Sequence, residues 1–282
     1  MKLKIYMTQL LDTLASIIGL RKYCVLRFTP THLNIISAAL NEPQVWCKLS
    51  NNLFEHYEVE SLRDNTISFE MNIEQLLQVL KQFEKSNSDK LAIRLQKKGN
   101  DSGKRSASLA VFFDDTISTT NTVTHTFSIS VRLLRKESDE RINEPELSNV
   151  DVLMKLPPDI SSLFKRIDRY RSVNFLKIIG SKKGSLSLNV QEENNLNVTI
   201  TWNEKLQVQQ KKDSLTNIED DEDDENFEIL VKLKDWKLGS RICDICKNLV
   251  LIISQEEALV LHCYLDDDES CEIIYFISGV NQ

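Results

Sequence analysis

The pattern of apolar and polar positions runs through the same order of predicted elements twice, and the second pass begins near Val150. Each pass opens with a short alternating run, 2–6 or 151–156, which predicts a strand. A stretch with apolar residues at helical spacing follows in each pass: Leu10, Leu11, Leu14, Ile17 and Ile18 in the first, and Ile160, Leu163, Phe164 and Ile167 in the second. Because the repeat spans about half the chain, far more than one solenoid repeat, it predicts two similar domains in tandem.

The rest of each pass consists mainly of predicted strands separated by polar turns. In the first pass the strands are expected at 23–28, 33–37, 45–49 and 67–71, then, after a helix bearing Ile73, Leu76, Leu77 and Leu80, at 91–95, 109–113 and 126–134. The polar stretches 97–106 and 116–124 are predicted to be turns or loops. In the second pass, strands at 175–179 and 186–190 flank a hairpin turn at 181–185, and a helix from about 235 to 247 precedes the last three strands.

Two polar segments lack any apolar periodicity. Residues 135–149 contain Pro145 and predict an exposed connector between an N-terminal domain, 1–134, and a C-terminal domain, 150–282. Residues 211–226 include seven consecutive acids at 219–225. Because like charges repel and few apolar groups are present, this segment is predicted to be a disordered acidic insertion.

Composition excludes several classes of protein. No stretch approaches the ~18 uninterrupted apolar residues of a membrane span, and the N-terminus lacks the continuous apolar core of a secretory signal, which favours an intracellular protein. With only 7 glycines, the chain has neither GxGxxG nor GxxxxGK[ST], so neither a phosphate-binding loop nor a bound cofactor is expected.

The candidates for metal or catalytic chemistry are few. Cys243 and Cys246 form a lone CxxC, for which two thiols on adjacent turns of one helix are favoured over a metal or redox site. The candidates for a general base are His32, His56, His125 and His262, and none has a nucleophile motif nearby. A structural role is therefore favoured over a hydrolase, and the chain is not predicted to be an enzyme.

The charge of the predicted second-domain helices points to a different function. Residues 158–171 and 234–247 each carry four lysines or arginines against two aspartates, although the whole chain has a net charge of −7. A basic surface on an acidic protein favours a localised site for a polyanion. The alternative is that these charges form only the solvated faces of amphipathic helices, and charge by itself favours this alternative.

Several short segments, each weak alone, together resemble a known family in their order and spacing. They are MKLKI at 1–5, CVLRFTP at 24–30, QVWCKL at 44–49, VTHTFSISVRLL at 123–134, EP at 144–145 followed by DVLMKLP at 151–157, and YFIS at 275–278. This series resembles the Hus-type subunit of the checkpoint sliding clamp, the 9-1-1 complex, within the PCNA-like clamp superfamily. The connector is poorer in proline than is usual in that family, and the acidic run looks like an insertion specific to one lineage.

The resemblance implies an α+β fold of two tandem clamp domains, each with two helices packed on one face of antiparallel sheets. The helices would line a central hole for double-stranded DNA, with phosphate contacts from Lys85, Lys165, Arg166, Arg169, Lys237, Arg241 and Lys247 that carry no sequence information and weaken with salt.

It also implies a non-catalytic subunit of a nuclear heterotrimeric ring, loaded at damaged DNA to promote checkpoint signalling and repair. The partners would be two other clamp-like chains, paired through edge strands, and a clamp-loader ATPase, with no membrane partner. The alternative is another clamp paralogue, either the replicative processivity factor or the Rad-type subunit.

Overall fold

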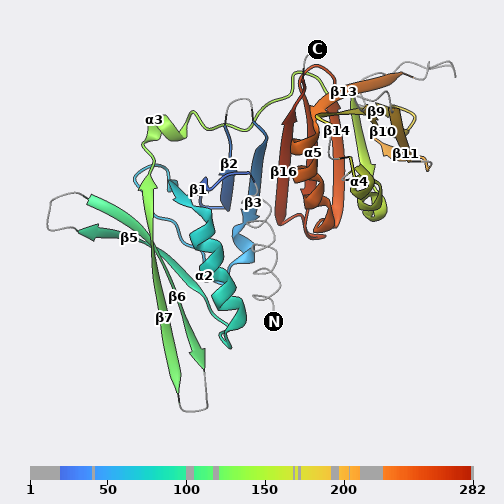
Figure 1. Ribbon diagram of the computed structural model, residues 1–282. Helices are drawn as coiled ribbons and strands as arrows, with labels where there is room; N and C mark the ends of the chain where they lie inside the picture. Colours follow the sequence, from blue (N-terminus) through green and yellow to red (C-terminus); the bar gives the residue numbers. More distant parts are fainter. Residues whose placement is uncertain are drawn as a thin grey trace. The chain divides into compact units, whose positions relative to one another are not determined.

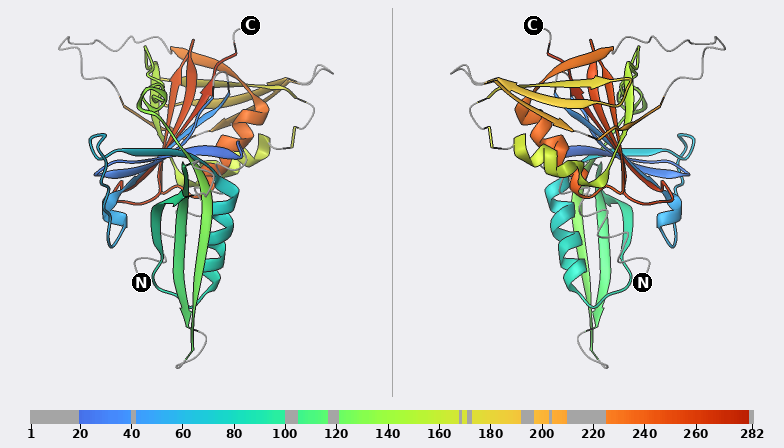
Figure 2. Two further views of the ribbon diagram at one scale, coloured as in Figure 1. Left: turned by 90° about the vertical axis from the view of Figure 1, so that its left-hand side faces the viewer. Right: turned by 90° about the vertical axis from the view of Figure 1, so that its right-hand side faces the viewer.

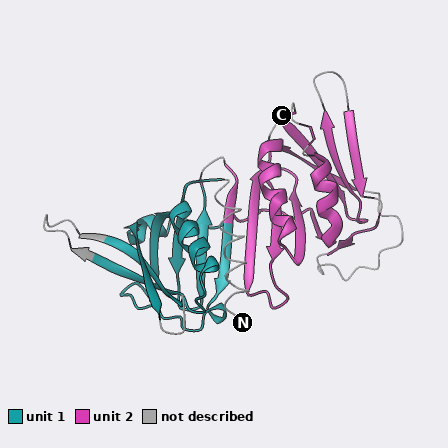
Figure 3. Cartoon of the chain, turned by 60° about the horizontal axis from the view of Figure 1, so that its bottom comes forward, with its two compact units in different colours: residues 1–38, 46–144 teal, residues 39–45, 145–282 magenta. Residues whose placement is uncertain are grey.

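The computed structural model describes residues 20–39, 42–99, 105–116, 121–167, 169–170, 173–191, 197–202, 204–209 and 225–280. The chain consists of two compact units: unit 1, residues 1–38 and 46–144, and unit 2, residues 39–45 and 145–282 (Figure 3). The predicted strand at 2–6 and the predicted first helix lie outside the described residues. So does the predicted acidic insertion, apart from Glu225 and Asn226, and Asn226 opens a strand rather than belonging to a loop.

Over its described residues, unit 1 is an antiparallel β-structure with one long helix (Figure 1). Its elements are β1 (Tyr23–Phe28), β2 (His32–Ser37), β3 (Gln44–Ser50), η1 (Asn51–Leu53), β4 (Ile67–Asn72), α2 (Ile73–Lys85), β5 (Ala92–Gly99), β6 (Arg105–Thr116), β7 (Thr122–Leu133) and α3 (Lys136–Asp139). The strand order within the unit is β3-β2-β1-β4-β7-β6-β5. β1 pairs with β2 and with β4, and β7 joins β4 to the β6–β5 hairpin.

The core of unit 1 follows from the two periodicities of its sequence. Alternate residues of β1 and β4 are buried, including Cys24 and Phe69, because successive strand side chains point to opposite faces. α2 buries Leu76, Leu80 and Phe83, which recur at helical spacing. The helix begins where the Asn72 side chain accepts a hydrogen bond from the Glu74 amide at 3.0 Å, as an N-cap does.

The polar segments that separate β5, β6 and β7 are shorter than predicted. β5 and β6 stay paired as far as Gly99 and Arg105, and β6 and β7 stay paired as far as Thr116 and Thr122. The loop prediction for 97–106 is therefore wrong at both ends, and the one for 116–124 is wrong at Thr116 and over 122–124. Backbone pairing needs no apolar side chains, so a hairpin can extend into solvent with polar residues on both faces.

In the described part of unit 2, two antiparallel sheets are accompanied by a layer of helices. Its elements are β8 (Val152–Leu156), η2 (Pro158–Ile160), α4 (Ser161–Ile167), β9 (Phe175–Ser181), β10 (Leu186–Gln191), β11 (Asn197–Trp202), β12 (Gln207–Val208), β13 (Asn226–Lys232), α5 (Leu233–Ser240), η3 (Arg241–Asp244), β14 (Asn248–Ser254), β15 (Ala258–Tyr264) and β16 (Cys271–Ser278). The strand orders within the unit are β12-β8-β14-β15-β16 and β11-β10-β9-β13. The hairpin turn predicted at 181–185 is confirmed, and Gly184 supplies its positive φ of 91°.

The helices of unit 2 pack on each other through buried aromatic rings. The rings of Phe164 in α4 and Trp236 in α5 meet edge to face with centroids 4.7 Å apart. The Tyr275 hydroxyl of β16 donates to the Asp235 carbonyl of α5 at 2.9 Å, which ties the helical layer to a sheet. α4 and α5 lie side by side (Figures 1 and 2). None of the helices among the described residues combines the length and the hydrophobicity that a membrane span requires.

Candidate nucleic-acid interface

Six of the seven predicted DNA-contacting residues lie on or beside the helical layer of unit 2, which we define as residues 161–170 and 233–247. Lys165 and Arg166 belong to α4, Arg169 follows it, Lys237 belongs to α5, Arg241 opens η3, and Lys247 directly precedes β14. α4 buries Leu163, Phe164 and Ile167 and thereby turns the intervening basic residues outward. Lys85 is the last residue of α2 in unit 1, so it is not part of this layer.

Three of these cations already have partners within unit 2. Lys165 Nζ lies 2.8 Å from Asp244 Oδ1, a contact that links α4 to η3. Lys237 Nζ donates to the Tyr170 carbonyl at 3.2 Å. Lys247 Nζ donates to Asp267 at 2.7 Å, and this hydrogen bond raises the pKa of Lys247.

The three arginines of the layer are differently placed. Arg166, Arg169 and Arg241 are exposed, and among the described residues their guanidinium groups have no hydrogen-bond or ion-pair partner. The Lys165–Asp244 pair joins the two segments that carry them. A guanidinium group presents a planar fork of donors that matches two phosphate oxygens, so these arginines are suited to hold a phosphate backbone without reading bases.

The acid partners are the feature of this surface that sequence reasoning missed. Asp244 and Lys165 are 79 positions apart by residue number, and neither periodicity nor local charge shows that they meet. The net charge taken from the sequence includes Asp244 with residues 234–247. In the structure, however, Asp244 neutralises Lys165 of α4. Only the tertiary packing of α4 on α5 shows which cations are neutralised.

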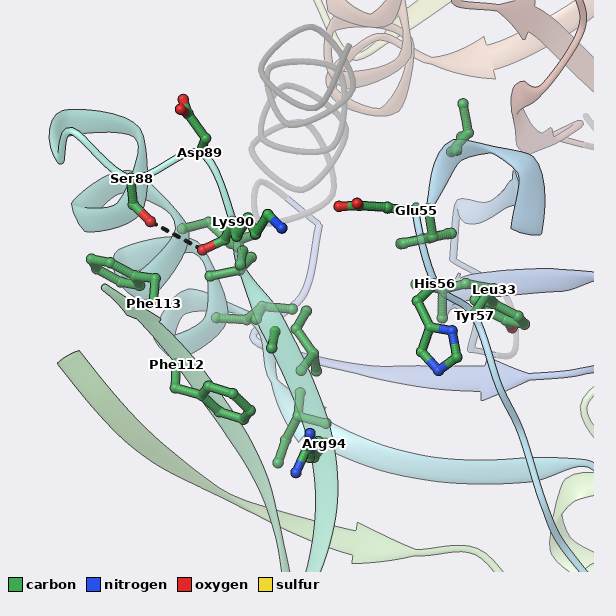
Figure 4. A pocket seen from close by; sticks show the side chains of 18 of the residues that line it. Leu33, Glu55, His56, Tyr57, Ser88, Asp89, Lys90, Arg94, Phe112 and Phe113 are labelled. Atoms are coloured by element: carbon green, nitrogen blue, oxygen red, sulfur yellow. Dashed lines mark hydrogen bonds between the residues drawn. The ribbon is translucent and has the colours of Figure 1, made fainter. Parts of the chain in front are cut away.

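A concave feature lies within unit 1 and has a different chemistry from the helical layer of unit 2 (Figure 4). It is a cavity of about 710 Å³ whose walls include Leu33 and Tyr57 on one side and Phe112 and Phe113 on the other. The Tyr57 hydroxyl lies 2.7 Å from the His32 carbonyl, and burial raises the pKa of Tyr57 to about 12. Its lining combines aliphatic and aromatic side chains with charged ones, among them Glu55, Asp89, Lys90 and Arg94, so it suits an apolar group flanked by polar ones. No sequence pattern indicates this cavity, because residues from several strands supply its walls.

All four histidines have contacts in the structure. His32 Nδ1 lies 2.7 Å from the Thr31 hydroxyl, His56 Nε2 lies 3.3 Å from Glu58, and His262 Nε2 lies 2.5 Å from Glu272. The His125 ring stacks on a phenylalanine ring with centroids 4.8 Å apart.

The prediction that both thiols of the CxxC lie on one helix is wrong. Cys243 lies in η3, which ends at Asp244, and the Cys246 thiol beyond it donates back to the Ile242 carbonyl at 2.9 Å. Burial raises the pKa of Cys243 well above its ordinary value, which keeps this thiol protonated. Within the described ranges no group of three or more metal-ligating side chains could hold an ion.

Comparisons with known proteins agree with this architecture. The chain is 28% identical to the DNA damage checkpoint control protein MEC3 of Eremothecium gossypii, with 94% of each chain covered, and 27% identical to the checkpoint protein hus1 of Schizosaccharomyces pombe, with 91% and 90% covered. Its structure is similar to the proliferating cellular nuclear antigen of Entamoeba histolytica, with a TM-score of 0.66 at 13% identity over 98% of this chain and 96% of that one. It is also similar to the PCNA2–PCNA3 complex of Sulfolobus tokodaii, with a TM-score of 0.65 at 14% identity over 97% and 96%.

At these identities the structural matches show the fold alone, and they confirm the predicted α+β fold of tandem clamp domains. The model of the family described as Hus1-like protein matches residues 1–281. The chain therefore belongs to the Hus1-like protein family.

Proposed function

We propose that this chain is a non-catalytic subunit of a heterotrimeric DNA sliding clamp that is loaded at damaged DNA and promotes checkpoint signalling and repair. The observation that carries the proposal is the match to the Hus1-like family over residues 1–281, on a chain with the clamp fold. The names of its curated relatives, DNA damage checkpoint control protein and checkpoint protein, support the same role.

The helical layer of unit 2 would face the DNA. Arg166, Arg169 and Arg241 supply exposed guanidinium groups for phosphates. Lys165, Lys237 and Lys247 add ammonium groups, and aspartates partly neutralise those of Lys165 and Lys247. Lys85 would add a contact from α2 of unit 1. Such binding is independent of sequence, as a clamp that slides requires.

The partners would be two other clamp-like chains, a clamp-loader ATPase and double-stranded DNA, in the nucleus. β11 supports the ring assembly because within the described residues it pairs only with β10, which leaves its outer backbone edge available. An open edge can add a strand from another chain, and that pairing also protects the edge from aggregation. The lack of a nucleotide-binding motif fits a ring that depends on an external ATPase for loading.

Assembly is tested with the purified full-length chain, alone and mixed with two clamp-like chains, by sedimentation and native mass spectrometry. We expect a monomer alone and a 1:1:1 complex in the mixture. A homotrimer of this chain would instead support the replicative processivity factor.

DNA binding is tested with the triple variant Arg166→Ala, Arg169→Ala, Arg241→Ala in the assembled ring. Each lost phosphate contact should reduce the slope of log retention against log salt by about 0.9. The matched control removes three lysines of the same unit at β9 and its turn, Lys177, Lys182 and Lys183. Equal effects of the two triple variants would refute the assignment of the helical layer to DNA.

A further inference from the structure

Residues 148–151, at the end of the polar segment, are held against the turn between β14 and β15. The Ser148 amide donates to Glu257 Oε2 at 2.9 Å, and the Ser148 hydroxyl donates to the other oxygen of the same carboxylate. Asp151 accepts from the Gln255 amide at 2.8 Å on one oxygen and from Asn149 Nδ2 at 2.5 Å on the other. All these groups belong to unit 2, and we call this set of contacts the clasp.

Within the clasp, Glu257 carries a negative charge. The two hydrogen bonds from Ser148 lower the pKa of Glu257, first through the hydroxyl and then through the amide. The carboxylate is therefore ionised at neutral pH, and its two oxygens occupy the space in front of the Ser148 hydroxyl. Any negative group added to that hydroxyl would meet this charge at hydrogen-bond distance.

Ser148 is also accessible and lies among acids. It is exposed, and residues 143–149 belong to neither a helix nor a strand. Glu144 and Glu146 precede it, and Asp151 follows three positions later. Protein kinases whose substrate clefts are basic select serines with carboxylates at such positions, because the charges are complementary. The clasp consists of surface hydrogen bonds, each of small net free energy in water, so the segment can leave the turn to enter such a cleft.

We propose that Ser148 is a phosphorylation site for an acid-directed serine/threonine kinase and that the modification opens the clasp. The Ser148 oxygen forms a bond to the γ-phosphorus of ATP, the bond from that phosphorus to ADP breaks, and the hydroxyl proton passes to the base of the kinase. The phosphoserine carries close to two negative charges and has lost the O–H that donated to Glu257. Repulsion replaces the hydrogen bond, and the segment around residues 143–149 is released.

The experiment uses the full-length chain with Mg·ATP and an acid-directed kinase, with the modified residue assigned by tandem mass spectrometry. We expect phosphate on Ser148, a slower reaction in the Asp151→Asn chain, and no phosphate at this position in the Ser148→Ala chain. The rate of amide hydrogen exchange then shows whether the clasp is closed or open. Corrected for the rate of the free phosphopeptide, exchange at the Ser148 amide should become about tenfold faster after phosphorylation, the loss expected for a hydrogen bond to a charged acceptor.

The Glu257→Gln chain separates repulsion from a general effect of the modification. Its neutral amide can still accept from Ser148, so phosphorylation should change exchange much less than in the unsubstituted chain. The proposal is wrong if the kinase leaves Ser148 unmodified, or if phosphorylation leaves exchange at Ser148 and Gln255 unchanged. Neither result depends on DNA or on ring partners, so failure here is distinct from failure of the proposed clamp function.

Discussion

Replacing Asp139 tests the least expected contact of unit 1. Asp139 ends α3 in a segment that the sequence predicts to be an exposed connector, yet it is only 5% exposed. Its carboxylate accepts from Arg27 Nε at 3.0 Å, from Arg63 Nη2 at 3.2 Å and from the Ser68 hydroxyl at 2.7 Å. Arg27 also donates to two carbonyls of this segment, those of Asp139 and Ile142, both at 2.9 Å. The prediction that residues 135–149 are exposed throughout is therefore wrong at Asp139.

The size of the effect follows from what the substitution leaves behind. Removing one partner of a buried ion pair costs about 3–5 kcal/mol, because the other charge stays buried. Here the arginine side chains are 19% and 29% exposed, and Arg27 keeps its two carbonyl partners, so water and backbone compensate in part. For Asp139→Ala we expect a loss of about 2–4 kcal/mol in the free energy of unfolding of unit 1. Asp139→Asn should lose about 1 kcal/mol less, because its amide oxygen can still accept from Ser68.

The measurement is amide exchange in β1 and β4, the strands that carry Arg27 and Ser68, as a function of urea concentration. The matched control is Glu140→Ala, which removes the next carboxylate along the chain. Glu140 is 62% exposed and lies 3.7 Å from Lys136, so this change should cost at most about 0.5 kcal/mol. If the two alanine variants lose the same stability, Asp139 does not anchor the segment to unit 1.

Two further predictions concern packing and thiol reactivity. Gly239→Ala should destabilise unit 2 by about 1–3 kcal/mol, because the new methyl would lie 2.6 Å from Tyr275 Cε1. Gly279→Ala should be tolerated, because the nearest neighbour of its methyl would be 3.4 Å away, and the thermal midpoints of the two variants test the difference. Iodoacetamide at pH 8 should modify Cys246 first, because the five other thiols are buried and burial raises the pKa of Cys24 to about 12. Rapid labelling of Cys24 in the native protein, detected by mass spectrometry, would contradict this expectation.

The contacts of Asp139 also show which parts of the structure the sequence could predict. Alternation predicted β1 over its full length, and helical spacing predicted α2, because in both elements burial of one face imposes a local period. Burial of Asp139 has no such period, since its neighbours are polar and its partner Arg27 is 112 positions away in the sequence. A buried ion pair between distant segments exists only in the folded chain, so a polar composition was mistaken for exposure.

The same reasoning applies to the candidate DNA surface and gives its sharpest test. The sequence identified the basic segments, but the structure shows that Asp244 neutralises Lys165 at 2.8 Å while Arg166 remains unpaired among the described residues. If this layer faces DNA, Asp244→Ala should free Lys165 for a phosphate. The assembled ring should then hold DNA more tightly, and the salt slope should steepen by about 0.9.

The control is Glu228→Ala, which makes the same change in net charge in the same unit. It frees Lys177, whose Nζ lies 3.0 Å from Glu228 on the β9–β13 pair rather than on the helical layer. A general increase in positive charge would strengthen DNA retention in both variants, whereas a channel lined by α4 and α5 responds only to Asp244→Ala. Loss of the folded ring would affect both variants alike, so a gain confined to Asp244→Ala distinguishes a DNA-facing surface from a merely solvated one. An unchanged salt slope in the Asp244→Ala ring would show that Lys165 does not face the phosphates.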